Sequence, residues 1–167
     1  STSVIGSSNL YARADHVHAL TAVPAPIVTG AFGSGSISVG SIIERGTVSA
    51  TAATGTITLA TSAQAALYYT ANATGNFVLN VTNIASNLTA DGQMMSVVFV
   101  TEMGPIVYNL TSLQIDGTAA NVTLKWQTGS GSGIPVATAS ATNAYTFTII
   151  RTGAGVYRVL GNLSYFK

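Results

Sequence analysis

Two histidines, His16 and His18, have the spacing of a metal site and lie in the polar segment Ser1–Leu20. Residues two apart in an extended strand project to the same side. Three copies around a threefold axis would therefore present six imidazoles, an octahedral set suited to a transition metal. The alternative is that both histidines form hydrogen bonds to Asp15 or to the backbone in a packed junction. Because an imidazole must be neutral to bind a metal, such a site would empty below a pH of about 6.5.

The acidic residues form no comparable motif. Asp91, Glu102 and Asp116 are far apart in the sequence, and a glycan-cleaving site would need two of their carboxylates to meet in space. No Gly-x-Ser-x-Gly motif and no phosphate-binding glycine loop precedes a helical segment. The sequence therefore predicts a protein that is not an enzyme, with no cofactor apart from the metal considered above.

Asparagine offers a third kind of site, because six of the ten asparagines begin an Asn-x-Ser/Thr triplet. These are Asn72, Asn80, Asn87, Asn109, Asn121 and Asn162. In an extracellular protein such triplets accept glycans. The alternative is that turn ends and threonine-rich strands produce the same triplet for structural reasons.

The composition limits the partners. Charged residues make up 7% of the chain, against about 25% in an ordinary soluble domain, and Gly46 to Ala90 contains none. A net charge of +1 without a basic stripe argues against nucleic-acid binding. No apolar run reaches the roughly 20 residues that span a bilayer, so membrane insertion is not expected. The absence of cysteine excludes disulfides and thiolate metal sites.

Short alternating runs predict the elements that must position these residues. The clearest is a hairpin from Tyr145 to Asn162, with a turn at Thr152–Gly155. Further strands are expected at 42–50, 54–59, 65–69, 76–81, 93–101, 106–110, 113–116 and 121–127, and one helical turn at 84–91. The nearly apolar run Gln93–Thr101 predicts a central strand buried on both faces. This spacing favours an all-β fold, an antiparallel β-sandwich of jelly-roll type.

The proline-rich segment Ala22–Pro26 marks a boundary. We expect residues 1–22 to form an extended arm or linker and residues 23–167 to form the β-sandwich domain, with strands beginning near Ile27.

A short N-terminal motif and a set of five later segments resemble phage proteins. Tyr11-Ala-Arg-Ala-Asp-His-Val-His18 is similar to a motif of tail-fibre and other virion proteins of tailed bacteriophages, at junctions between fibre modules. Residues 44–56, 67–69, 124–127, 145–151 and 159–161 resemble the C-terminal module of virion structural and fibre-like proteins of marine cyanophages. The resemblance implies a β-rich, trimeric particle protein displayed on the virion.

These observations predict a non-enzymatic structural protein of a phage particle, either a tail-fibre or tip module or a capsid-decoration protein. The alternative is a secreted, glycosylated protein that forms extracellular filaments. Neutral surface and unprotected sheet edges predict a homo-oligomer, most simply a trimer, in which the arm lies on a neighbouring copy. Other virion proteins and a host surface glycan are the expected partners. Tyr68, Tyr69 and Trp126 could stack on sugar rings if exposed, or pack in the core.

Overall fold

The computed structural model describes residues 43–127 and 133–167, which form nine strands and one short helix. In chain order these are β1 (Gly46–Ala52), β2 (Gly55–Ala60), β3 (Ala66–Asn72), β4 (Phe77–Thr82), α1 (Ile84–Asn87), β5 (Met94–Met103), β6 (Leu110–Ile115), β7 (Val122–Trp126), β8 (Ala141–Gly153) and β9 (Val156–Phe166). The prediction of an all-β fold is confirmed. The arm, its histidines, the boundary after residue 22 and the strands expected from Ile27 to residue 42 lie outside the described residues.

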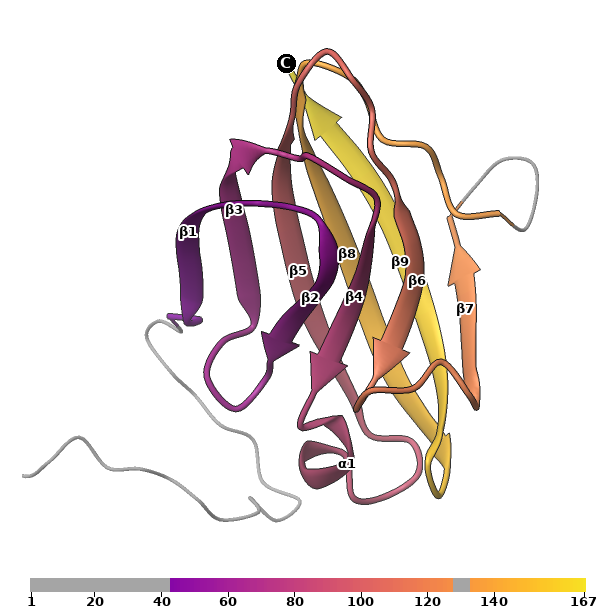
Figure 1. The fold of residues 1–167 in the computed structure, drawn as a ribbon. Helices are drawn as coiled ribbons and strands as arrows, with labels where there is room; N and C mark the ends of the chain where they lie inside the picture. The colour runs from indigo at the N-terminus through magenta and orange to yellow at the C-terminus, as the bar shows by residue number, and fades with distance from the viewer. Residues whose placement is uncertain (1–42, 128–132) are drawn as a thin grey trace, which may run out of the picture. The chain divides into compact units, whose positions relative to one another are not determined.

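The chain winds between two sheets. Sheet A has six strands in the order β1-β3-β5-β8-β9-β7, and sheet B has three in the order β2-β4-β6. Strands β1 to β6 alternate between sheet A and sheet B. Each of β1 to β4 therefore pairs with the strand that comes two later in the chain. In Figure 1, the strands of sheet B lie in front of sheet A.

The prediction of an antiparallel sandwich is wrong for most of the strand pairs. The β1–β3, β3–β5, β2–β4, β4–β6 and β7–β9 pairs are parallel, and only β5–β8 and β8–β9 are antiparallel. This order also departs from a jelly roll, which is built from antiparallel strands. The physical reason is that the short connections at residues 53–54 and 73–76 turn the chain from one sheet to the other instead of folding it back as a hairpin.

Stacked corners keep successive windings in register. Thr74 donates its backbone N–H to the carbonyl of Ala53 at 3.1 Å, and Gly55 donates to the carbonyl of Asn76 at 3.2 Å. A side chain at Gly75 would place its Cβ 2.7 Å from Thr54 Oγ1. The second corner therefore fits against the first only because Gly75 has no side chain.

The predicted hairpin is confirmed. β8 and β9 pair antiparallel through a turn that contains Gly155 at a φ of 67°. Tyr145, Phe147 and Ile149 are buried on one face of β8, as the alternation predicts.

Other expected elements differ in detail. β5 is buried on one face only, because its burial alternates along the strand, so the prediction of a strand buried on both faces is wrong. Residues 106–109 form a loop before β6 rather than a strand. The helical turn is present as α1, and its backbone N–H groups at Ile84 and Ala85 donate to the Asp116 carboxylate at 3.3 and 2.9 Å.

Aromatic rings join the two sheets in one apolar cluster. Phe77 of sheet B packs edge-on against Phe99 at 5.5 Å between ring centroids and against Tyr145 at 5.9 Å. Trp126 extends the cluster from the edge strand β7 and packs edge-on against Phe147 at 5.5 Å. These contacts fix one face of sheet A as the inner face.

Trp126 reaches β8 by crossing Gly161 of β9, its register partner. A Cβ at position 161 would lie 2.9 Å from Trp126 Cε3 and Cζ3, which is closer than real Cβ contacts allow. Gly161→Ala should therefore lower the free energy of unfolding by about 1–3 kcal/mol through overpacking, measured by urea denaturation. Gly153→Ala is the matched control, because its Cβ would meet Val156 at an ordinary 3.6 Å. Equal effects of the two substitutions would contradict this reading of the core.

The Tyr145 hydroxyl is buried without a hydrogen bond of ordinary geometry. Burial raises its pKa to about 12, and the backbone of Leu110 opposes this shift only in part. Below pH 10 the hydroxyl is protonated in both the folded and unfolded states. Between pH 10 and 12 the unfolded chain loses its proton first, so the free energy of unfolding contributed by this group falls as the pH rises.

We therefore expect Tyr145→Phe to remove an alkaline loss of about 2 kcal/mol. Denaturation of both proteins at pH 8 and pH 11.5 measures it, with the wild type losing more stability than the variant. At pH 8 the variant should be as stable as the wild type, because the substitution removes an unpaired buried hydroxyl. Parallel alkaline losses in the two proteins would show that Tyr145 is not the group responsible.

Candidate functional site

The face of sheet A that points away from sheet B is the main candidate surface. It carries the even-numbered residues of β5 from Met94 to Glu102, of β8 from Thr142 to Ile150 and of β9 from Arg158 to Phe166, as the burial patterns and register require. Val48, Tyr68 and Lys125 continue it onto β1, β3 and β7. We call this surface the outer face of sheet A. It mixes apolar side chains with hydroxyls.

Glu102 is the one acidic residue of the outer face, and hydroxyl groups satisfy it. Tyr68 donates to Glu102 Oε1, and Thr142 lies 2.9 Å from both carboxylate oxygens. The pKa of Tyr68 is raised because its hydroxyl donates to Glu102, with smaller contributions from burial and from the charge of Glu102. The carboxylate is therefore held flat against the sheet.

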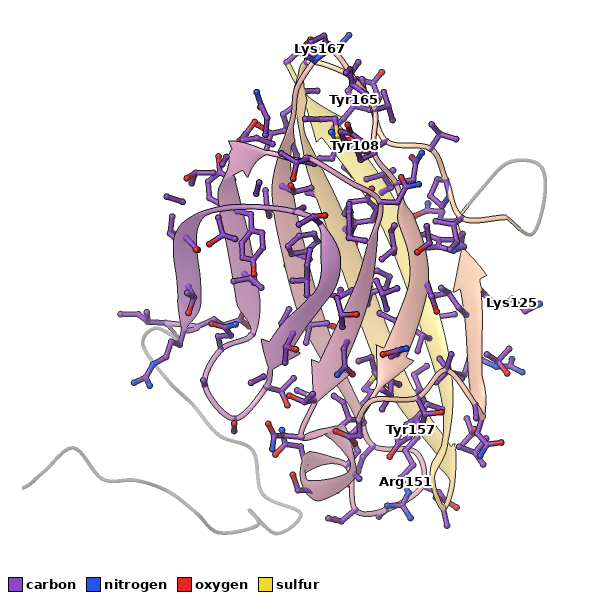
Figure 2. All side chains as sticks on the ribbon, in the orientation of Figure 1. Tyr108, Lys125, Arg151, Tyr157, Tyr165 and Lys167 are labelled. Atoms are coloured by element: carbon purple, nitrogen blue, oxygen red, sulfur yellow. The ribbon has the colours of Figure 1, made fainter. Side chains whose placement is uncertain are left out.

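The basic residues of the outer face lie at its β9–β7 side. Arg158 pairs in register with Thr123, and Lys125 pairs with Leu160. Figure 2 shows Lys125 projecting from β7 at the edge of the sheet. Between these two strands and β8 runs a shallow groove of about 380 Å³, lined by Lys125, Thr146, Thr148, Leu160 and Asn162 among others. The groove offers hydroxyl and amide groups beside Leu160 and Trp126.

A second candidate surface is the open edge of both sheets at the start of the winding. β1 pairs only with β3, and β2 pairs only with β4, among the described strands. Neither strand contains a charged residue or a proline, the usual devices that protect a sheet edge. Within residues 43–127 and 133–167, the outward backbone groups of this edge have no strand partner.

The three acids considered for glycan cleavage serve separate contacts. Asp91 forms an ion pair with Arg151 at 3.1 Å, Glu102 is bonded to hydroxyls on the outer face, and Asp116 binds the first turn of α1. Arg151, which lies beside α1 in Figure 2, also donates to the carbonyl of Leu88 at 2.8 Å. In residues 43–127 and 133–167 no group of three or more potential metal ligands occurs, and no helix there is long and apolar enough to cross a membrane. His16 and His18 lie outside those residues.

The triplet asparagines occupy different environments. Asn80 and Asn109 accept backbone hydrogen bonds at 2.9 Å from Gly117 and Ala137, respectively. Asn87 donates to Thr61 at 2.8 Å, and Asn162 donates to Ser164 at 3.2 Å. Asn72 and Asn121 are exposed. Four of the triplets therefore have structural hydrogen bonds at their asparagine.

The three aromatic residues considered for sugar stacking divide between the two faces of sheet A. Tyr69 packs edge-on against Phe99 at 5.6 Å, and Trp126 packs against the core. Tyr68 lies half-exposed on the outer face. Core packing is therefore confirmed for Tyr69 and Trp126 and is wrong for Tyr68.

Asn143 is a structural residue that sequence reasoning missed. It is fully buried, accepts a hydrogen bond from Thr138 N at 2.8 Å and donates to the carbonyls of Thr138 and Ala141. It secures the segment that leads into β8. The available signal was its place on the same side of the strand as Tyr145, where a polar residue needs internal partners.

Comparisons with protein-family models, with curated proteins and with solved structures found no match for this chain.

The two readings of the asparagine triplets predict different mutational effects. Asn109→Ala should lower the free energy of unfolding by about 1–2 kcal/mol, because it leaves the N–H of buried Ala137 without its acceptor. Asn72→Ala is the matched control, since its exposed side chain has no hydrogen bond among the described residues, and should change stability by less than about 0.5 kcal/mol. Urea denaturation of unglycosylated protein measures both. If Asn109→Ala also proves neutral, the structural explanation of this triplet fails.

Proposed function

We propose that this chain is a non-enzymatic structural subunit of a phage particle, as a tail-fibre or tip module or as a capsid-decoration protein. The observation that carries the proposal is the uncharged open edge formed by β1 and β2. A soluble protein that acts alone normally blunts such an edge with charge, proline or a covering segment. Because β1 and β2 contain neither charge nor proline, their edge suits a protein whose edges are covered by other chains.

The sequence motifs are the reason for proposing a phage particle. Tyr11–His18 and the stretches within residues 44–161 resemble tailed-phage and cyanophage virion proteins, and that resemblance motivates the phage assignment. The outward face of sheet B supports this assignment, because it presents threonine and serine hydroxyls rather than charges to solvent. Host-surface binding, if this module is a fibre tip, would use such neutral polar surface for a glycan.

For the assembly we propose a homotrimer of two-layer β-sandwich domains, each preceded by its arm. Closed symmetry removes the hazard of exposed edges, since each copy is covered by the next and no free surface is left to propagate. His16 and His18 would meet their counterparts only in such a trimer, which is the condition for the proposed metal site.

A secreted, filament-forming glycoprotein is the second candidate. The exposed positions of Asn72 and Asn121 favour it, because an exposed asparagine side chain has room for an attached glycan. Four other triplets bonded into the fold weigh against it.

The location of the protein, on phage particles or in free filaments, distinguishes the two candidate functions. We expect an antibody against the chain to detect it in density-gradient fractions that contain DNA-filled particles, and immunogold imaging to place it at the tail or over the shell. Tail labelling at low copy number would indicate a fibre, and dense labelling over the shell would indicate decoration. A control serum raised against an unrelated protein sets the background. Label confined to free filaments, with none on particles, would contradict the proposal and favour the glycoprotein.

A further inference from the structure

We infer that the outer face of sheet A is the surface on which a second copy of this chain packs. The inference rests on the proposed function of a self-assembling particle subunit and goes further, because it selects one face of the fold as the interface.

Four of the nine large hydrophobic side chains that are exposed in the described residues lie on this face. Val48, Met94, Leu160 and Phe166 have exposed fractions of 70, 61, 47 and 63%, and they spread across β1, β5 and β9. The exposed face of sheet B instead presents residues such as Thr56 and Thr58, and none of the large exposed hydrophobic side chains in the described part of the chain lies on it. A sheet face that carries such side chains and has no covering layer in the described residues is suited to contact with another chain.

The charges of the outer face permit burial. Glu102 accepts hydrogen bonds from Tyr68 and Thr142 and is the next-to-last residue of β5, so its carboxylate lies toward the strand end, where the rim of an interface stays in contact with water. Arg158 and Lys125 lie toward the β7 edge, where a packed neighbour leaves side chains at the rim in contact with water. The centre of the face, around Val98 and Thr146, is uncharged.

The size of the face matches a stable interface. Six strands of 5 to 13 residues, with a rise of about 3.3 Å per residue and a spacing of about 4.8 Å, cover on the order of 800 Å². A standard specific interface buries about 800 Å² on each partner. The groove on this face is shallow, and a second copy supplies a sheet face of the same size with the same mixture of apolar and hydroxyl side chains.

The test places a charge at the centre of this face. Thr146→Arg should dissociate the full chain to a monomer of 16.9 kDa in light scattering, with association weakened at least about 100-fold because each interface would bury an unpaired guanidinium. Thr111→Arg is the matched control, since Thr111 is an exposed strand threonine of β6 on sheet B, at the opposite edge from β2, and it should leave the wild-type mass unchanged. Circular dichroism of both variants checks that the strands persist.

Cysteine pairing gives an independent readout, because the native chain has no cysteine. Oxidised Thr146→Cys should form a covalent dimer of chains at a protein concentration at which the wild type is oligomeric, whereas Thr111→Cys should remain monomeric under denaturing conditions. A monomeric wild type, or an oligomer that keeps its mass in Thr146→Arg and crosslinks no better through position 146 than through position 111, would overturn the inference. The particle-location experiment does not depend on this result, so a particle protein with a different interface would be recognised as such.

Discussion

The aromatic contact between the sheets is the interaction on which the rest of the structure depends. Phe77 reaches from sheet B to Phe99 and Tyr145 of sheet A, and all three rings are buried. A small parallel sheet with one apolar face cannot persist in water unless that face is covered. The aromatic cluster therefore holds sheet B against one face of sheet A. The opposite side of the wider sheet is left without a covering layer in the described residues.

Strand positions could be predicted because alternation is a local property. Tyr145, Phe147 and Ile149 lie on the inner face of β8 as their spacing indicates, and the glycine turn after them is where the composition places it. Strand pairing could not be predicted in the same way, because alternation is identical in parallel and antiparallel strands. One signal of the winding was available. Ala-Thr-Gly occurs at 53–55 and again at 73–75, and these two corners stack in the structure.

The candidate surface was harder to predict than the fold. Val98 and Val100 led to the prediction that β5 is buried on both faces. In the structure these two side chains are half-exposed on the outer face. Composition alone cannot separate a valine in a core from a valine on an uncovered sheet, because both satisfy the same strand preference. The neighbouring Tyr68 and Tyr69 make the same point, since adjacent strand residues face opposite ways and only Tyr69 enters the core.

Several charged side chains of the described residues lie at the ends of the strands. Asp91 and Arg151 pair at the end of the strands near α1, and Asp116 binds the first turn of that helix. Figure 2 places Arg151 at one end of the strands and Lys167 at the other. Charges at the strand ends remain hydrated whichever neighbours cover the sides, so assembly through the sheet need not remove them from water. Lateral packing of the proposed assembly would favour few charges on the sides, because each buried ion there would need a partner from another chain.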